Sequence, residues 1–121
     1  MLAHVAVNVT DFEAAKRFYL GALAPFGYRL VYEEEGALAY LADEHGLDFG
    51  LGRREPVGGA HVAFECSDRE QVDAFYEAAL ASGGRDNGSP GLRAQYAPDY
   101  YAAYVLDPDG NNIEAVCHHA P

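Results

Sequence analysis

The apolar and polar positions of this chain follow one order twice. Each copy opens on a short segment, 4–9 and 61–65, whose alternation of apolar and polar residues is typical of a half-buried strand. Each copy then continues into a stretch whose apolar residues recur at steps of three and four, which predicts a helix with one buried face. The opening residues His4 and His61 lie 57 positions apart, and later residues keep that offset. A fixed offset of this kind indicates one supersecondary unit that is built twice.

Cap and breaker residues set the limits of the first predicted helix. Thr10 and Asp11 offer an N-cap, and Glu13 stands three residues after Thr10 as in a capping box. Pro25 and Gly27 end the helix, because proline cannot continue it and glycine tolerates the left-handed conformation of a helix end. The second copy repeats this order of cap and breaker residues.

Short strands are predicted after each helix. They are expected at 28–33, 37–41, 48–52, 101–106 and 112–117. Residues 86–98 are rich in glycine and proline, and we predict an irregular stretch there. The sequence Asp107-Pro108-Asp109-Gly110 is a strong signal for a tight turn between the last two strands.

These elements predict an α+β fold of two βαβββ modules. We expect one domain over residues 1–121, with the first module at 1–52 and the second at 60–119. Residues 53–59 are charged and then contain proline and glycine, as expected of a linker between the two units. We expect the modules to form a curved mixed sheet around a central cleft.

The amino-acid composition limits the kinds of molecule that this chain is expected to bind. The chain has 8 basic and 19 acidic residues, a formal net charge of −11, and would repel nucleic acid at long range. No apolar run approaches the roughly 18 residues of a membrane span, and the N-terminus lacks the pattern of a secretion signal. We therefore expect a small-molecule partner, no nucleic acid, no membrane and a cytoplasmic location. By strand parity Cys66 and Cys117 face the helices, and we expect free thiols that fill the core.

Three residues with metal-binding side chains can meet if the strands pair as expected. Alternate residues of a strand face opposite sides, and His61 and Glu114 have the parity that places each in the cleft. His4 joins them if the first strands of the two modules lie side by side. Two imidazoles and one carboxylate form the facial ligand set of non-haem iron(II), and manganese, nickel or zinc also fit it. We predict a divalent metal ion at His4, His61 and Glu114.

Four features together carry a resemblance to a known family. They are the paired modules, the His-Val-Ala that opens each, the Phe-Tyr pair of each helix, and the final Asp107-Pro108-Asp109-Gly110-Asn111-Asn112-Ile113-Glu114. Over essentially its whole length the chain resembles the vicinal oxygen chelate superfamily, which includes glyoxalase I, extradiol dioxygenases, fosfomycin-resistance thiol transferases and bleomycin-resistance proteins. The resemblance implies a glyoxalase-like fold, the three metal ligands named above, and a substrate that binds the metal through two neighbouring oxygens. It also implies a homodimer, in which one site sometimes takes ligands from two chains.

One position departs from the pattern of glyoxalase I. That enzyme usually takes a fourth ligand, a glutamate, from the last strand of its first module, and the matching position here is Gly50. Glycine has no side chain that could bind a metal or accept a proton. The resemblance therefore points away from glyoxalase I and toward the three-ligand members.

Other residues are candidates for substrate chemistry. Glu65 has the parity of the predicted ligands and Tyr101 lies in a strand at the cleft, so we predict both as catalytic residues. Arg93 is predicted to bind an anionic group of the substrate, and Tyr96 and Tyr104 to line the pocket. The plainer alternatives are a solvated carboxylate for Glu65 and core packing for the tyrosines.

Two functions of different class follow. The first is a metal-dependent enzyme that acts on a small molecule with vicinal oxygens, by lyase, isomerase, ring-cleavage or resistance-type transfer chemistry. The alternative is a metal-free protein of the bleomycin-resistance type that binds a small molecule or drug. The set of two histidines and one glutamate favours the enzyme, whereas the charge of −11 would suit a cationic drug.

Overall fold

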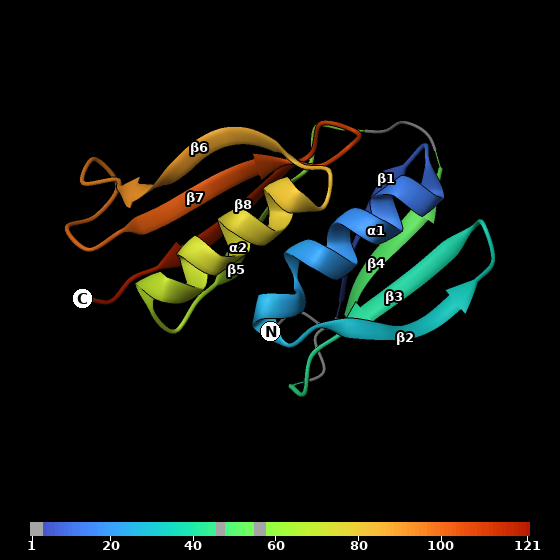
Figure 1. Cartoon of the computed structure of the whole chain (residues 1–121), viewed down its shortest axis with the longest axis horizontal. Coiled ribbons are helices and arrows are strands. Elements are labelled where there is room, and N and C mark those ends of the chain that lie inside the picture. Colours follow the sequence, from blue (N-terminus) through green and yellow to red (C-terminus); the bar gives the residue numbers. More distant parts are fainter. Residues whose placement is uncertain (1–3, 46–47, 55–57) are drawn as a thin grey trace.

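The chain folds as two successive modules, each a strand, a helix and three strands (Figure 1). The computed structural model describes residues 4–45, 48–54 and 58–121. The first module comprises β1 (His4–Val9), α1 (Phe12–Ala22), the short 3-10 helix η1 (Ala24–Phe26), β2 (Arg29–Glu34), β3 (Leu38–Ala42) and β4 (Asp48–Arg53). The second comprises β5 (His61–Glu65), α2 (Arg69–Ala81), β6 (Arg85–Leu92), β7 (Tyr101–Leu106) and β8 (Asn112–Cys117). The predicted α+β class with two βαβββ modules is confirmed.

Each module forms its own four-stranded mixed sheet. The strand orders are β1-β4-β3-β2 and β5-β8-β7-β6, with β1 parallel to β4 and β5 parallel to β8. Each helix packs on the sheet of its own module, and α1 and α2 contact each other between the two sheets (Figure 1). The strands β1 and β5, which open the modules, are therefore both edge strands.

A single core joins the two modules. Aromatic rings link the modules directly. The ring centres of Phe49 on β4 and Phe64 on β5 are 5.5 Å apart, and those of Phe26 on η1 and Phe75 on α2 are 5.6 Å apart. Cys66 and Cys117 are buried in the same core as free thiols, as predicted.

The predicted tight turn between β7 and β8 also joins the modules. Asp107 is fully buried, and its carboxylate accepts a hydrogen bond from the hydroxyl of Tyr19 on α1 at 2.6 Å. Asp109 accepts from the hydroxyl of Thr10 at 2.5 Å. Because Thr10 is used in this way, the N-cap of α1 is Asp11, whose side chain accepts from the backbone amide of Ala14. The turn therefore helps to hold the two modules together, and it also leads into the strand that carries Glu114.

The irregular stretch predicted over 86–98 is wrong in its first half. Residues Arg85–Leu92 form β6, which pairs antiparallel with β7 through two register shifts. The strand lies at the edge of its sheet, where Pro90 is tolerated because the amide hydrogen it lacks is not needed by an inner neighbour. Gly88 has a φ of +150°, and glycine tolerates this conformation at the irregularity. Part of the predicted linker, residues 55–57, lies outside the described residues.

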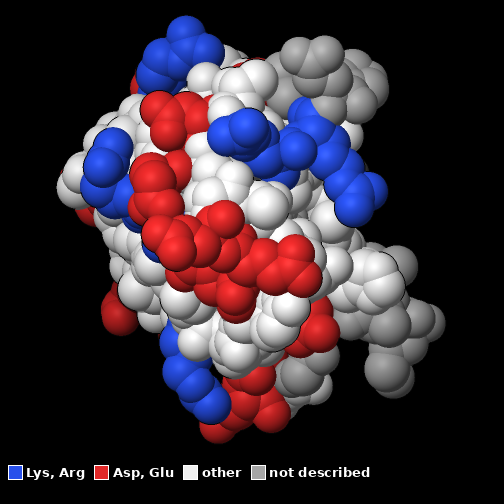
Figure 2. All heavy atoms as spheres, turned by 90° about the vertical axis from the view of Figure 1, so that its right-hand side faces the viewer, with Lys and Arg blue, Asp and Glu red and all other residues white. Residues whose placement is uncertain are grey.

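The surface reflects the acidic composition. On the face shown in Figure 2, acidic side chains gather in a continuous band, whereas basic side chains lie around its margin. Neither α1 nor α2 is long and apolar enough to cross a membrane.

Candidate functional site

His61 and Glu114 are neighbours on the side of the second sheet that faces away from the helices. They lie on adjacent parallel strands, where Ala63 of β5 is in register with Glu114 of β8. The Nε2 atom of His61 lies 3.1 Å from Oε1 of Glu114. The glutamate is 3% exposed, whereas the histidine side chain is half exposed and closes the site from outside. The structure therefore brings together two of the three predicted metal ligands.

A backbone carbonyl fixes which ring nitrogen of His61 carries a proton. The Nδ1 atom lies 3.1 Å from the carbonyl oxygen of Asn112. A carbonyl oxygen only accepts, so Nδ1 carries a proton, and Nε2 meets the carboxylate either through a second proton or, in a neutral ring, as an acceptor. Two such acceptors lie this close only when a positive charge, a proton or a metal ion, is shared between them. A histidine that donates one nitrogen to a carbonyl and presents the other is the usual arrangement of a metal ligand.

The spacing of the two atoms also fits a metal ion. Bonds of roughly 2.0 to 2.2 Å that meet at right angles place two ligand atoms about 3 Å apart. The distance from Nε2 of His61 to Oε1 of Glu114 is 3.1 Å. This distance is that of a hydrogen-bonded ion pair, and it is equally compatible with two neighbouring ligands of one divalent ion.

His4 is not brought to this pair within one chain. It lies exposed at the start of β1, in register with Asp48 of β4. Within residues 4–45, 48–54 and 58–121, no group of three His, Cys, Asp or Glu side chains is close enough to hold one ion. Strand parity could not anticipate this result, because it depends on how the two separate sheets are placed.

Three tyrosines surround the His61–Glu114 pair. Tyr96, Tyr100 and Tyr104 line a cavity of about 380 Å³ together with both residues of the pair and Asn112. The hydroxyl of Tyr100 donates a short hydrogen bond to Oε2 of Glu114. Tyr96 and Tyr104, which are predicted to line the substrate pocket, both lie in the wall of this cavity. Tyr100 is not among the site residues predicted above; it immediately precedes β7, and extending the parity of Tyr104 to that position would have found it.

Tyr101 lies elsewhere, which corrects its predicted position. Its hydroxyl donates to Asp73 of α2 at 2.7 Å, and its ring lies 5.0 Å from the guanidinium of Arg69 on the same helix. Tyr101 begins β7 and faces α2, whereas Tyr100, the residue before the strand, faces Glu114. The structure thus gives Tyr101 no contact with the site.

Glu65 is also separate from Glu114. Its Oε1 lies 3.2 Å from Nδ1 of His118, and the Glu65 side chain is 71% exposed. The ring of His118 in turn meets the ring of Tyr100 edge-on at 5.2 Å. Glu65 therefore reaches the site only through two intervening side chains.

Arg93 lies at the margin of the tyrosine cavity. Its guanidinium lies 5.4 Å from the ring centre of Tyr104 and donates to the carbonyl oxygen of Ser89 at 2.8 Å. A cationic group held over an aromatic wall can meet an anionic group of a ligand in that cavity. The predicted binding of an anionic substrate group by Arg93 stays a prediction.

Gly50 is the counterpart of Glu114 in the first module. It is in register with Ala6 of β1, as Glu114 is with Ala63 of β5. The ring of Tyr40 covers it, and a Cβ atom added at Gly50 would lie only 2.6 Å from that ring. Both the missing side chain and the ring over it exclude a fourth ligand from this position as the chain is folded.

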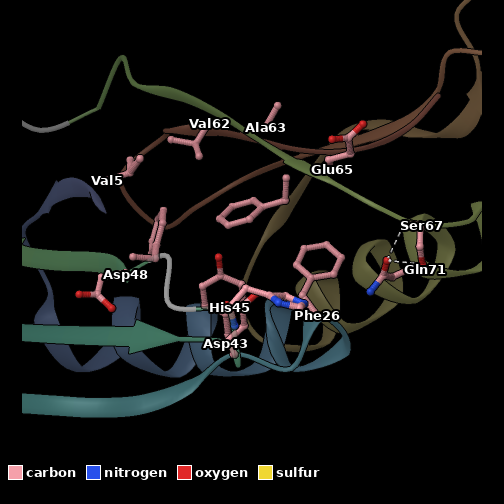
Figure 3. A pocket seen from close by; sticks show the side chains of 13 residues that line it. Val5, Phe26, Asp43, His45, Asp48, Val62, Ala63, Glu65, Ser67 and Gln71 are labelled. Atoms are coloured by element: carbon pink, nitrogen blue, oxygen red, sulfur yellow. Dashed lines mark hydrogen bonds between the residues drawn. The ribbon is translucent and has the colours of Figure 1, made fainter. Parts of the chain in front are cut away.

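A larger cavity, of about 570 Å³, lies between the modules and away from Glu114. Val62, Ala63 and Glu65 of β5 lie along one side, with Asp43, His45 and Asp48 across from them (Figure 3). Its walls also include four aromatic side chains: Phe26, Tyr28, Phe49 and Phe64. Burial and then the charges of Asp43 and Asp48 raise the pKa of Tyr28, which indicates a negative potential at this wall.

Comparisons with known proteins agree with this architecture. A family model described as the Glyoxalase/Bleomycin resistance protein/Dioxygenase superfamily matches residues 1–115. A crystal structure of a glyoxalase/bleomycin resistance protein from Albidiferax ferrireducens T118 is 32% identical, with a TM-score of 0.82, and the alignment covers 100% of this chain and 99% of that one. The uncharacterized protein YqjT of Bacillus subtilis (strain 168) is 27% identical, over 93% of this chain and 95% of its own.

Two more distant structures share the fold. Lactoylglutathione lyase from Agrobacterium tumefaciens is 21% identical with a TM-score of 0.75, covering 97% of this chain and 92% of its own. The fosfomycin resistance protein FosX from Mesorhizobium loti is 19% identical with a TM-score of 0.71, covering 97% of this chain and 91% of its own. Relatives of such different activity show that the fold alone does not select a reaction. By its family match and its paired modules, the chain belongs to the glyoxalase/bleomycin resistance protein/dioxygenase superfamily.

Proposed function

We propose that this chain is a metal-dependent enzyme that acts on a small molecule with two neighbouring oxygens. The observation that carries the proposal is the pair of His61 and Glu114, in which Nε2 lies 3.1 Å from Oε1 and the carbonyl of Asn112 holds Nδ1. A purely structural pair would not need a half-exposed histidine over a buried carboxylate at the wall of a cavity. The ion proposed here is divalent: iron, manganese, nickel or zinc.

His4 is proposed as the third ligand, supplied by a second copy of the chain. The strands β1 and β5 end separate sheets, so each has one edge that pairs with no other described strand. If β1 of one copy lies beside β5 of the other, an exposed His4 reaches the exposed side of His61. The site then belongs to a homodimer, and each dimer holds two sites.

The residues around the pair define what the site can do. A divalent ion there would act as a Lewis acid on two adjacent substrate oxygens. Tyr96 and Tyr104 offer flat walls to the body of the substrate, and Arg93 offers a positive charge at the margin. Gly50 supplies no carboxylate, so the base of a glyoxalase I reaction is missing. The reactions still proposed are the lyase, isomerase, ring-cleavage or transfer reactions of members with three metal ligands.

Metal content tests the proposal directly. Untagged wild-type protein is compared with Glu114→Gln, which keeps the shape of the side chain but removes its charge, and with Glu77→Gln, an exposed helix position, as the control. After reconstitution with each metal, mass spectrometry should find about one ion per chain in the wild type and the control, and at least 100-fold weaker binding in Glu114→Gln. Equal binding by Glu114→Gln, or none by the wild type, would contradict the proposal.

The second candidate is a metal-free binder, favoured by the cavity between the modules. Aromatic walls and the carboxylates of Asp43, Asp48 and Glu65 surround it, and its described lining contains neither lysine nor arginine. Its volume of about 570 Å³ suits a drug-sized molecule. Such a lining would hold an organic cation with an apolar body.

Three molecules with one apolar body separate this candidate from the enzyme. Thermal unfolding is measured with 4-phenylbutylamine, which is cationic, 4-phenylbutanol, which is neutral, and 4-phenylbutyrate, which is anionic. A binder of this kind should be stabilised in that order, because a ligand that binds only the folded chain raises its stability. Asp48→Asn should weaken the preference for the amine. Equal shifts with all three molecules would argue against the binder.

A further inference from the structure

The second oxygen of Glu114 is already occupied. Oε1 faces Nε2 of His61, whereas Oε2 accepts the hydrogen bond of the Tyr100 hydroxyl. Glu114 is 3% exposed, so water does not compete freely for either oxygen. Both oxygens of a carboxylate can bind one ion, and this arrangement leaves only Oε1 for that purpose.

Tyr100 is itself held firmly in place. Its ring packs edge-on between Tyr96 and His118, with ring centres 5.2 Å apart in both cases. Its carbonyl oxygen accepts from the backbone amide of Arg93 at 2.7 Å, and its own amide donates to Ala97 at 3.2 Å. These contacts orient the Tyr100 side chain toward Glu114.

The hydroxyl of Tyr100 stays a donor at neutral pH. A phenol is neutral at pH 7, because its ordinary pKa is about 10. A neutral phenol donates to a carboxylate without adding charge beside it. The contact thus orients the carboxylate without adding charge to the site.

We propose that Tyr100 is a positioning residue that holds Glu114 as a one-oxygen metal ligand. The inference rests on the proposed metal-dependent function. By holding Oε2, Tyr100 keeps the carboxylate from turning its second oxygen to the ion, so coordination positions stay open for two substrate oxygens. Hydrogen bonds of this kind to a metal ligand commonly raise metal affinity by a factor of 10 to 100.

The neighbouring residue supplies a matched control. Tyr100→Phe and Tyr101→Phe each remove one hydroxyl that donates to a carboxylate, but only Tyr100 touches Glu114, since Tyr101 bonds to Asp73. Purified wild type and both variants are titrated with Co²⁺, and affinity is obtained by competition with a chelator. The visible absorption of bound Co²⁺ reports its coordination independently of any activity.

Tyr100→Phe should bind Co²⁺ about 10-fold more weakly and change its absorption spectrum, whereas Tyr101→Phe should match the wild type in both. If wild type binds Co²⁺ and Tyr100→Phe equals it in affinity and spectrum, the inference is overturned and the metal site stands. If wild type binds no metal, the proposed function fails and the inference fails with it. Should Tyr100→Phe not fold, His118→Ala carries the test, because it removes the ring beside Tyr100 at a half-exposed position after β8. Weaker Co²⁺ binding by His118→Ala then supports the inference, and unchanged binding overturns it.

Discussion

The two modules present different side chains at equivalent points of one frame. The equivalent pairs, by strand register, are Ala6 with Ala63, Gly50 with Glu114, and Tyr40 with Tyr104. In the first module a tyrosine ring covers a glycine, and in the second a glutamate stands at that point with tyrosines around it. The repeat supplies the frame, and one residue in the last strand of each module decides which module carries the carboxylate.

The same comparison applies to the helices. Tyr19 of α1 and Tyr76 of α2 are equivalent, and each donates its hydroxyl to an aspartate. Tyr19 is fully buried and reaches Asp107 of the other module, whereas Tyr76 bonds to exposed Asp86 of its own module. Tyr19 thus helps to join the two modules, whereas Tyr76 acts within its own module.

The largest effect is expected in a test of whether His4 of the first module completes the metal site of a second copy. His4→Ala and Glu114→Gln chains are coexpressed with two removable tags, and the mixed dimer is isolated. Each variant alone should bind little metal. The mixed dimer should recover about one ion per dimer, because one of its two sites takes every ligand from unaltered positions.

Mass spectrometry of the mixed dimer gives the metal content. If all ligands of a site came from one chain, no site of the mixed dimer would be complete and nothing would be recovered. A wild-type dimer with the same tags removed is the control.

The two equivalent tyrosines should differ in their effect on stability. Tyr19→Phe removes a buried donor from Asp107 and should lower the free energy of unfolding by about 1 to 3 kcal/mol. Tyr76→Phe removes an exposed hydrogen bond and should change it by less than about 0.5 kcal/mol. Urea unfolding measures both. Equal losses would show that the modules are joined mainly by other contacts.

Gly50 and Tyr40 should be coupled. Gly50→Ala places a Cβ atom 2.6 Å from the Tyr40 ring and should cost about 1 to 2 kcal/mol of unfolding free energy. In a Tyr40→Val background the same change should instead stabilise by about 0.5 kcal/mol, because glycine is unfavourable in an open strand position. A double-mutant cycle from urea unfolding measures this coupling. The same sign in both backgrounds would mean that the ring yields without cost.

Most of the elements followed from local pattern, and β6 shows where that fails. Alternation, caps and glycine stops located the helices and seven strands, since these signals act within a few residues. Residues Arg85–Leu92 contain glycine and proline and have no alternation, so nothing local marks them as a strand. Pairing with β7 holds them in place, and that is a long-range contact.

The sequence predicted which side chains meet on paired strands, but not which side chains meet across the two sheets. Parity alone placed His61 and Glu114 toward each other, and it would also have separated Tyr100 from Tyr101. The distance between His4 and that pair depends on how two independent sheets meet. This is decided by the packing of the core between the sheets, which no periodicity in the sequence reports.

The smallest effect is expected at Cys66, whose equivalent in the first module is Val9. Both are buried in the core, and burial raises the pKa of the Cys66 thiol from its ordinary 9.0 to about 12. Between these pH values the unfolded chain has lost the thiol proton and the folded chain keeps it, so folding stability is complete below pH 9 and falls as pH rises toward 12. Cys66→Val makes the second module resemble the first, and should alter the unfolding free energy by less than about 1 kcal/mol at pH 7.5. Urea unfolding at pH 7.5, 9.5 and 10.5 should show that the unfolding free energy of the variant falls less steeply with rising pH than that of the wild type. The tyrosines titrate alike in both proteins and do not contribute to this difference. Parallel profiles would mean that the thiol ionises equally in the folded and unfolded chains.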